Sequence, residues 1–152
     1  MYGRRFFGVA QHATYTPESP RRIKGAAQRH RPLGLWMVVY THELDRPYWN
    51  DWMDSVDVVS LWIWDSSNLP KTAELVAQCR KRFPRQRINM GIYIRDYSKR
   101  APVELAMLES ELDAIRRLQK AGDVESYGIL GGCLIDQHPV QAAFIRDYIR
   151  GH

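Results

Sequence analysis

Four short apolar segments recur along the chain, and each of them ends on a polar or acidic side chain. They are rich in β-branched and aromatic residues, and each precedes a longer stretch whose apolar positions have helical spacing. Strands that are buried on both faces of a parallel sheet have this nearly continuous apolar pattern. The pattern therefore predicts an α/β fold with parallel strands within residues 35–43, 58–65, 88–96 and 127–136.

The stretches between these segments carry start and stop signals for helices. The clearest one has a single apolar face and ends before Gly122, a residue suited to the left-handed position after a helix. This face is formed by Leu105, Leu108, Leu112, Ile115 and Leu118. Other helices are expected to begin at Pro47, at Pro70 after the candidate cap Asn68, and near His138-Pro139.

The first 32 residues differ from the rest of the chain. They are expected to hold at most one weak βα unit, with a short strand at Phe6–Ala10 and a helix from Ser19 to His30. The inward positions of that helix would be Ile23, Ala26 and Ala27. We therefore divide the chain into a basic N-terminal segment, 1–32, and a C-terminal part, 33–152, with four βα units.

Two architectures fit four to five βα units in 152 residues. The predicted strand starts are 23, 30 and 39 residues apart. An eight-fold TIM barrel of ~250 residues allots about 31 residues to each unit, so a partial (βα)8 TIM barrel is the first expectation. The alternative is an open parallel sheet of flavodoxin-like size. The sequence lacks the glycine-rich phosphate-binding motifs of many open sheets, which favours the partial barrel.

The net charge of +5 is concentrated at the N-terminus. Residues 1–31 carry seven Arg and Lys against one acidic residue, and the remainder is close to neutral. Because this segment has no nucleic-acid-binding motif, a solvated helix face is expected and nucleic acid is not an expected partner. No apolar run is long enough to span a membrane, and no signal peptide follows the basic start. We expect a soluble protein, in the cytoplasm or in a compartment that the sequence does not specify.

Acidic residues stand where each predicted strand ends. They are Glu43, Asp65, Asp96 and Asp136. Ligands of parallel α/β sheets bind at the carboxyl ends of the strands, so these four side chains would share one mouth. The structural alternative is that each acid caps the helix that follows its strand. Neither a metal site nor a cofactor is expected, because no ligand spacing such as H-E-x-x-H occurs.

Aromatic side chains accompany these acids. Trp62 and Trp64 flank Ile63, so they point to the same side of their strand. Trp62 is expected to fill the core, whereas Trp64, next to Asp65, offers a flat apolar face to a sugar ring. The remaining candidate ligand contacts are Tyr40, His42, Tyr93, Tyr97 and Asp136.

The segment from Leu35 to the end resembles the C-terminal half of glycoside-hydrolase-like TIM-barrel proteins, a largely uncharacterised family. The resemblance lies in the strand ending Val39-Tyr40-Thr41-His42-Glu43, the strand 57–64 with its paired tryptophans, and the segment 90–97 before a long amphipathic helix. It implies a half-barrel in which strand-end carboxylates act on a carbohydrate. Such a half-barrel would need a second copy or a missing N-terminal half-barrel to be complete.

The leading functional hypothesis is a carbohydrate-active barrel fragment in which Asp65, Asp96 and Glu43 are the catalytic carboxylates. Glycoside hydrolysis needs two such groups, one to protonate the leaving oxygen and one to attack or to activate water. If Asp65 and Asp96 are this pair, one of them is expected to lie in a less polar setting that raises its pKa. Two alternatives stand beside it, which leaves the question of enzyme activity open. One is a non-catalytic domain that binds a sugar or another small polar ligand, and the other is a truncated fragment without independent activity.

Overall fold

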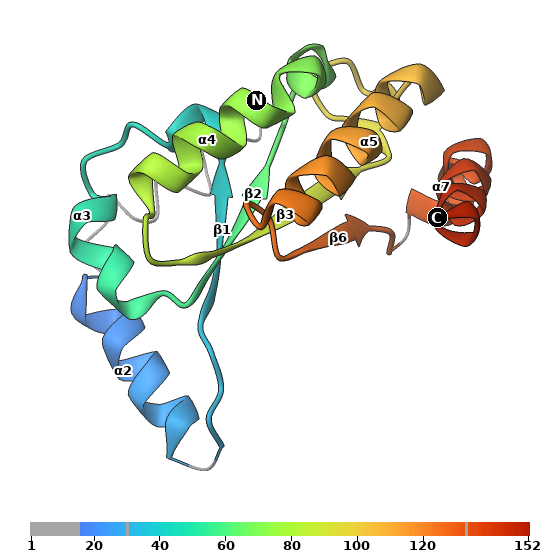
Figure 1. The fold of residues 1–152 in the computed structure, drawn as a ribbon. Coiled ribbons are helices and arrows are strands. Elements are labelled where there is room, and N and C mark those ends of the chain that lie inside the picture. Colours follow the sequence, from blue (N-terminus) through green and yellow to red (C-terminus); the bar gives the residue numbers. More distant parts are fainter. Residues whose placement is uncertain (1–15, 30, 133) are drawn as a thin grey trace.

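A parallel sheet of four strands forms the centre of the computed structural model, which describes residues 16–29, 31–132 and 134–152 (Figure 1). The strands are β1 (Trp36–Tyr40), β2 (Val58–Trp62), β3 (Arg87–Tyr93) and β6 (Ser126–Leu130). They pair in the order β1-β2-β3-β6, and all three pairings are parallel. The predicted α/β class and the four parallel strands are confirmed, and the sheet is consistent with both a partial barrel and an open sheet.

Helices connect the strands. Helices α4 (Thr72–Arg82) and α5 (Leu105–Ala121) lie side by side over one face of the sheet, and α7 (Pro139–Gly151) lies beyond β6 (Figure 1). The short elements are α3 (Trp49–Trp52), α6 (Leu134–Gln137), the 3-10 helices η1 (Thr41–Glu43), η2 (Met53–Ser55) and η3 (Ser66–Lys71), and the hairpin β4 (Arg95–Asp96) and β5 (Ala101–Pro102). Helical structure thus follows β1, β2 and β6 directly and follows β3 after the hairpin, as the alternating pattern predicted.

The face of the sheet under α4 and α5, which we call the core face, is aliphatic. Its central side chains have no exposed surface; they are Val39, Val59, Leu61, Ile88, Met90 and Ile92. Alternate residues of a strand point to opposite faces, and the strand register places these six in adjacent rows. Leu108, Leu112 and Ile115 of α5 complete this core, which confirms the apolar stripe read from the sequence.

The opposite face, which we call the polar face, is built differently. One row across it consists of Val38, Ser60, Asn89 and Ser126, and the next consists of Tyr40, Trp62, Gly91 and Gly128. Ser60 Oγ accepts hydrogen bonds from Trp62 Nε1 at 2.9 Å and from Asn89 Nδ2 at 3.1 Å. Ser126 Oγ donates to Asn89 Oδ1 at 2.9 Å. Polar side chains that are buried on this face are therefore satisfied by one another across three strands.

Helix α2 (Glu18–Gln28) exists where a helix was predicted, but its expected packing is wrong. Ile23 is 53% exposed, and Ala26 is exposed as well. The helix lies near the amino end of β1 and contacts η2 instead of a face of the sheet (Figure 1). The strand predicted at Phe6–Ala10 lies outside the described residues.

Local signals at the helix ends have mixed outcomes. Gly122 adopts a φ of 83° directly after α5, so its predicted role as a stop is confirmed. The candidate cap Asn68 is wrong, because Pro70 lies inside η3 and α4 begins at Thr72. Asp65 caps η3 instead, through the backbone N–H of Ser67. A strand extending to Asp136 is also wrong: β6 ends at Leu130, and Asp136 is an exposed residue of α6.

Candidate functional site

The carboxyl ends of β1, β2 and β3 bring six rings together. We call this set the aromatic cluster; its members are Tyr40, His42, Trp62, Trp64, Tyr93 and Tyr97. Trp64 is central: it stacks on Tyr97 with ring centroids 4.9 Å apart and meets Tyr40 edge to face at 5.5 Å. Tyr93 contacts Trp62 at 4.6 Å and Tyr97 at 5.0 Å. The rings thus form one continuous set of contacts across three strands.

Exposure within the aromatic cluster is graded. Tyr93 is buried, and its hydroxyl shares a hydrogen bond with Tyr40. Burial, followed by this hydrogen bond, raises the pKa of Tyr93 far above its usual value, so its hydroxyl stays protonated. Trp62, Trp64, Tyr40 and Tyr97 are half-buried, and His42 is an exposed ring stacked on Tyr40 at 5.5 Å. A firmly held inner ring therefore supports outer rings that keep surface toward solvent.

Gly91 makes room for the indole of Trp62. A Cβ atom at position 91 would lie 2.0 Å from the Trp62 ring, so a side chain there would displace it. Gly91 was absent from the candidate residues, as was the polar row of Ser60, Asn89 and Ser126. A glycine inside an otherwise apolar strand is the signal for such a close approach, and it is present in the sequence.

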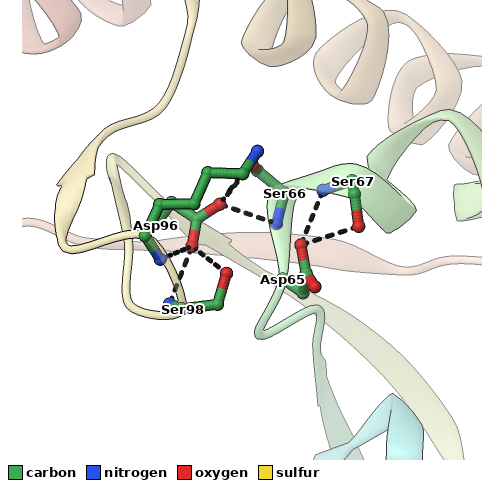
Figure 2. Close-up of polar contacts among 6 residues, drawn as sticks. Asp65, Ser66, Ser67, Asp96 and Ser98 are labelled. Atoms are coloured by element: carbon green, nitrogen blue, oxygen red, sulfur yellow. Dashed lines mark hydrogen bonds and ion pairs between the residues drawn. The ribbon is translucent and has the colours of Figure 1, made fainter.

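Asp96 is buried and bound from several directions (Figure 2). Its Oδ2 accepts from the backbone N–H of Ser66 at 3.2 Å and from the Ser66 hydroxyl. Its Oδ1 accepts from the backbone N–H of Ser98 at 2.7 Å, from Ser98 Oγ at 2.6 Å and from the backbone N–H of Lys99 at 2.9 Å. Burial alone would raise the pKa of Asp96, but these hydrogen bonds hold it well below its usual range.

Asp65 makes a smaller version of the same turn. Its Oδ1 accepts from the backbone N–H of Ser67 at 2.9 Å and from Ser67 Oγ at 2.7 Å (Figure 2). These two hydrogen bonds lower the pKa of Asp65. Asp-x-Ser therefore recurs at consecutive strand exits, as Asp65-Ser66-Ser67 and Asp96-Tyr97-Ser98, and holds the chain as it turns.

This geometry corrects one expectation about the Asp65 and Asp96 pair. A hydrolytic pair needs one carboxyl group whose pKa is raised so that it can donate a proton. The pKa of each of the two is lowered, because each accepts hydrogen bonds from nearby serines. The expectation of a raised pKa in this pair is therefore wrong.

Glu43, unlike the two aspartates, has a raised pKa. It is the last residue of η1, is only 5% exposed, and its Oε2 has no hydrogen-bond partner. Burial raises the pKa of Glu43 to about 7, against the opposing effects of the Tyr40 backbone N–H and the Arg46 charge. Glu43 Oε1 lies 3.8 Å from His42 Nε2, and burial together with Arg46 lowers the pKa of His42. Glu43 can therefore hold a proton near neutral pH, beside the outermost ring of the aromatic cluster.

The space around these groups is shallow. A depression lined by residues that include Trp64, Ser66, Tyr93 and Asp96 has a volume of about 10 Å³, roughly that of one water molecule. A much larger cleft of about 680 Å³ lies at the opposite, amino end of the strands, between α2 and the starts of β2 and β3. Its charged side chains are paired, for example Lys24 with Asp57 at 2.6 Å and Arg87 with Glu125 at 3.0 Å. Within the described part of the chain, Trp64 and Tyr93 of the aromatic cluster thus line a small depression and not the large cleft.

Two further observations concern the part of the chain that the structure describes. No group of three or more His, Cys, Asp or Glu residues there is arranged to hold a metal ion. No helix among those residues is both long and apolar enough to cross a membrane. Asp136, one of the expected ligand contacts, is an exposed residue of α6.

Comparison with known proteins gives one structural likeness. No protein-family model and no curated protein sequence matches the chain. The fold is similar to the solved structure of the PgaB (BpsB) glycoside hydrolase domain from Bordetella bronchiseptica, with a TM-score of 0.54 and 20% sequence identity. The similarity covers 81% of this chain and 37% of that one, so the chain spans well under half of its neighbour. At this identity the likeness shows the fold, and the activity of the neighbour is a property of that protein.

Proposed function

We propose that the aromatic cluster binds a carbohydrate at the carboxyl ends of β1, β2 and β3. The observation that carries this proposal is the continuous set of ring contacts around Trp64. Four of these rings are half-buried, and they lie at the carboxyl ends of the strands, where parallel α/β proteins bind their ligands. The faces of a sugar ring are lined by C–H groups, and a half-buried indole offers them a flat apolar surface that needs no desolvation of charge.

Polar groups beside the rings suit the hydroxyl groups of a sugar. Asp65 is ionised at neutral pH and only half-buried. Its carboxylate can therefore accept hydrogen bonds from the hydroxyl groups of a sugar that stacks on Trp64. The shallow surface favours a segment of an oligosaccharide that lies across the rings over a small molecule that must be enclosed. The likeness of fold to a glycoside hydrolase domain supports the carbohydrate class at the level of the fold.

Glycoside hydrolysis is the second candidate function, and Glu43 is the observation that favours it. A buried carboxyl group with a pKa of about 7 and an oxygen atom without a partner is suited to donate a proton. In this proposal Glu43 is the acid, and the ionised Asp65 is the base or nucleophile. Asp96, which accepts five hydrogen bonds from protein groups, is assigned to the turn instead.

The binding proposal is tested by titrating the full chain with cellohexaose and with a chitosan hexamer while recording the indole N–H resonances in a ¹H–¹⁵N NMR spectrum. Trp64→Ala should weaken binding at least tenfold, because one stacked ring contributes about 1–3 kcal/mol by analogy with aromatic stacking on other flat ligands. Trp52→Ala is the matched control, since Trp52 is also half-buried but lies in α3. If neither oligosaccharide shifts any resonance, the proposal fails.

The hydrolytic proposal has a separate test. Product formation from the oligosaccharide that binds should be lost in Glu43→Gln, while its affinity stays within a factor of two or so of the parent chain. The rate should fall as the pH rises above about 7, because Glu43 then loses the proton that it donates. Binding without any product from the parent chain would leave carbohydrate binding as the function and refute hydrolysis.

A further inference from the structure

The hairpin of β4 and β5 carries positive charge beside the aromatic cluster. Residues 95–102 contain three cations and one acid, so their formal net charge is +2. The cations are Arg95, Lys99 and Arg100. The loop of the same hairpin holds Tyr97, whose ring stacks on Trp64 at 4.9 Å. On the basis of the carbohydrate binding proposed above, we infer that the bound oligosaccharide is acidic and that this hairpin recognises its carboxylate groups.

The one acid of the hairpin is already engaged within the protein. Asp96 is 2% exposed and accepts five hydrogen bonds, and Lys99 Nζ lies 3.6 Å from its Oδ2. Arg95 and Arg100 form no ion pair in the part of the chain that the structure describes. Every Asp and Glu of the sequence lies within that part, so the sequence holds no further acid to neutralise them. Two guanidinium groups therefore remain to pair with an anionic ligand.

Arg95 is held next to the stacked rings by the hairpin itself. Its Nη2 donates a hydrogen bond to the backbone carbonyl of Arg100 at 3.2 Å, and Arg95 lines the small depression together with Trp64. A guanidinium group has five N–H donors in a planar fork, which matches the two oxygens of a carboxylate. A carboxylate on a sugar that stacks on Trp64 therefore lies within reach of a guanidinium group that is already fixed in place.

Arg100 occupies a strained backbone position. Its φ of 57° lies in the left-handed region, and no other non-glycine residue of the described ranges has a positive φ. Glycine adopts this conformation without strain, and asparagine adopts it more readily than a long side chain does. Strain of this kind persists where the residue serves a ligand site, so an arginine here favours a role for its charged group.

The acids next to the aromatic cluster do not cancel this charge below neutral pH. Asp65 is ionised, and the nearby Lys99 is one of the groups that lower its pKa. Glu43 holds a proton below a pH of about 7, because burial raises its pKa. In slightly acidic solution the three cations of the hairpin therefore exceed the two ionised aspartates, Asp65 and Asp96, and attract an acidic sugar.

The test compares two oligosaccharides that differ only in charge. They are cellohexaose and the hexamer of cellouronic acid, in which each primary alcohol of the same chain is oxidised to a carboxylate. Titration of the full chain at about pH 6 and low salt should give at least tenfold tighter binding of the acidic hexamer, because carboxylate–guanidinium hydrogen bonds are strong. About 0.5 M salt should remove most of this difference and leave the affinity for cellohexaose unchanged, because salt screens exposed charges.

Variants of the hairpin locate the preference. Arg95→Gln combined with Arg100→Asn should abolish the preference for the acidic hexamer and keep the affinity for cellohexaose within about twofold; the asparagine tolerates the positive φ. Arg117→Gln combined with Lys120→Gln is the matched control and should keep the preference. It also removes two exposed cations, but they lie near the end of α5 that precedes Gly122, away from the hairpin. Circular dichroism checks that each variant is folded.

The possible outcomes separate the acidic class from carbohydrate binding itself. Equal affinity for the two hexamers, or a preference that survives in the hairpin variant, would overturn the acidic class and leave carbohydrate binding standing. Loss of the preference in the α5 control would overturn it as well, because overall charge would then decide. Tighter binding of a thymidine hexanucleotide than of the acidic hexamer would assign the cations to nucleic acid instead. If neither hexamer binds, the proposed function fails and the acidic class fails with it.

Discussion

The two faces of the sheet share the same strands but differ in what stabilises them. The core face is a continuous aliphatic surface under α4 and α5, and its central side chains have no contact with solvent. The polar face carries serines, an asparagine, glycines and aromatic rings, and it is ordered by hydrogen bonds and by one ring seated on Gly91. The aliphatic packing is therefore concentrated on one face, and the polar and aromatic groups to which we assign ligand binding lie on the other.

The carboxyl groups that follow the strands also differ from one another. Asp65 and Asp96 are held by turns of the same Asp-x-Ser type, and their pKa values are lowered. Glu43 is buried with an unpartnered oxygen atom, and its pKa is raised. Carboxyl groups at equivalent places in the strand pattern therefore differ in chemistry, because the hydrogen-bond donors around them differ.

The largest predicted effect is the loss of stability caused by a cavity in the core face, and it tests whether the two faces differ in what stabilises them. Leu61→Ala should lower the free energy of unfolding by about 2–5 kcal/mol, because Leu61 has no exposed surface and its loss leaves a void. Ser60→Ala, one residue earlier on the polar face, should cost about 1–2 kcal/mol, because Trp62 Nε1 and Asn89 Nδ2 both lose the acceptor that they share. Urea denaturation measures both. Equal costs would contradict the division of roles between the faces.

Removal of the Asp96 carboxylate should have the next largest effect. Asp96→Ala leaves backbone N–H groups of Ser66, Ser98 and Lys99 without their acceptor, and we expect a loss of about 3 kcal/mol. Asp65→Ala should cost about 1 kcal/mol, the usual value of an N-cap. If both variants lost the same stability, the two turns would be equivalent.

The same carboxylate sets the sign of the acid dependence. The pKa of Asp96 is lower in the folded chain than in the unfolded chain, so its stabilisation is complete above the unfolded value of about 3.9. It is lost as the pH falls below that value, because the unfolded state then takes up the proton first. Thermal unfolding between neutral and acid pH should therefore show a steeper decline for the parent chain than for Asp96→Asn.

The addition of a Cβ atom to a glycine of the polar face should have an intermediate effect on stability. Gly91→Ala should destabilise by about 1–3 kcal/mol, because the added methyl group collides with the Trp62 ring and forces it to move. Gly128→Ala, in the same row, is the control: the nearest atom to its Cβ would be Asn89 Nδ2 at 3.8 Å, an ordinary contact. Thermal unfolding compares the two. A tolerated Gly91→Ala would show that Trp62 is not held in place by the glycine.

The smallest predicted effect concerns a carboxyl group on the helical side of the core. Glu111 in α5 is 1% exposed, and burial raises its pKa to about 8. Between the unfolded value near 4.5 and about 8 the folded chain holds a proton that the unfolded chain has lost, so stability falls as the pH rises. Glu111→Gln should remove this decline, with a relative gain of about 1 kcal/mol from pH 7 to pH 8. Parallel pH profiles of parent and variant would refute the assignment.

The sequence by itself determined the class of fold and much of its detail. Nearly continuous apolar runs predicted the four parallel strands. The apolar stripe of α5 and its stop at Gly122 could be read from the sequence, because both depend on residues close together in the chain. The grouping of the candidate contact residues could also be predicted from the sequence, since the carboxyl ends of parallel strands lie at the same end of the sheet. The strand that was expected to reach Asp136 is wrong, because β6 ends at Leu130, before Gly131 and Gly132.

Only the tertiary structure decided the state of each polar group. The pKa of Asp96 depends on Ser66, which lies 30 residues earlier in the chain, and that of Glu43 depends on the burial of η1. The packing of the Trp62 ring over Gly91 is a contact between two strands, and no local sequence pattern indicates it. Hydrophobic periodicity records which side of an element is buried, whereas hydrogen bonding and desolvation depend on distant neighbours, and those are fixed only when the strands are aligned in register.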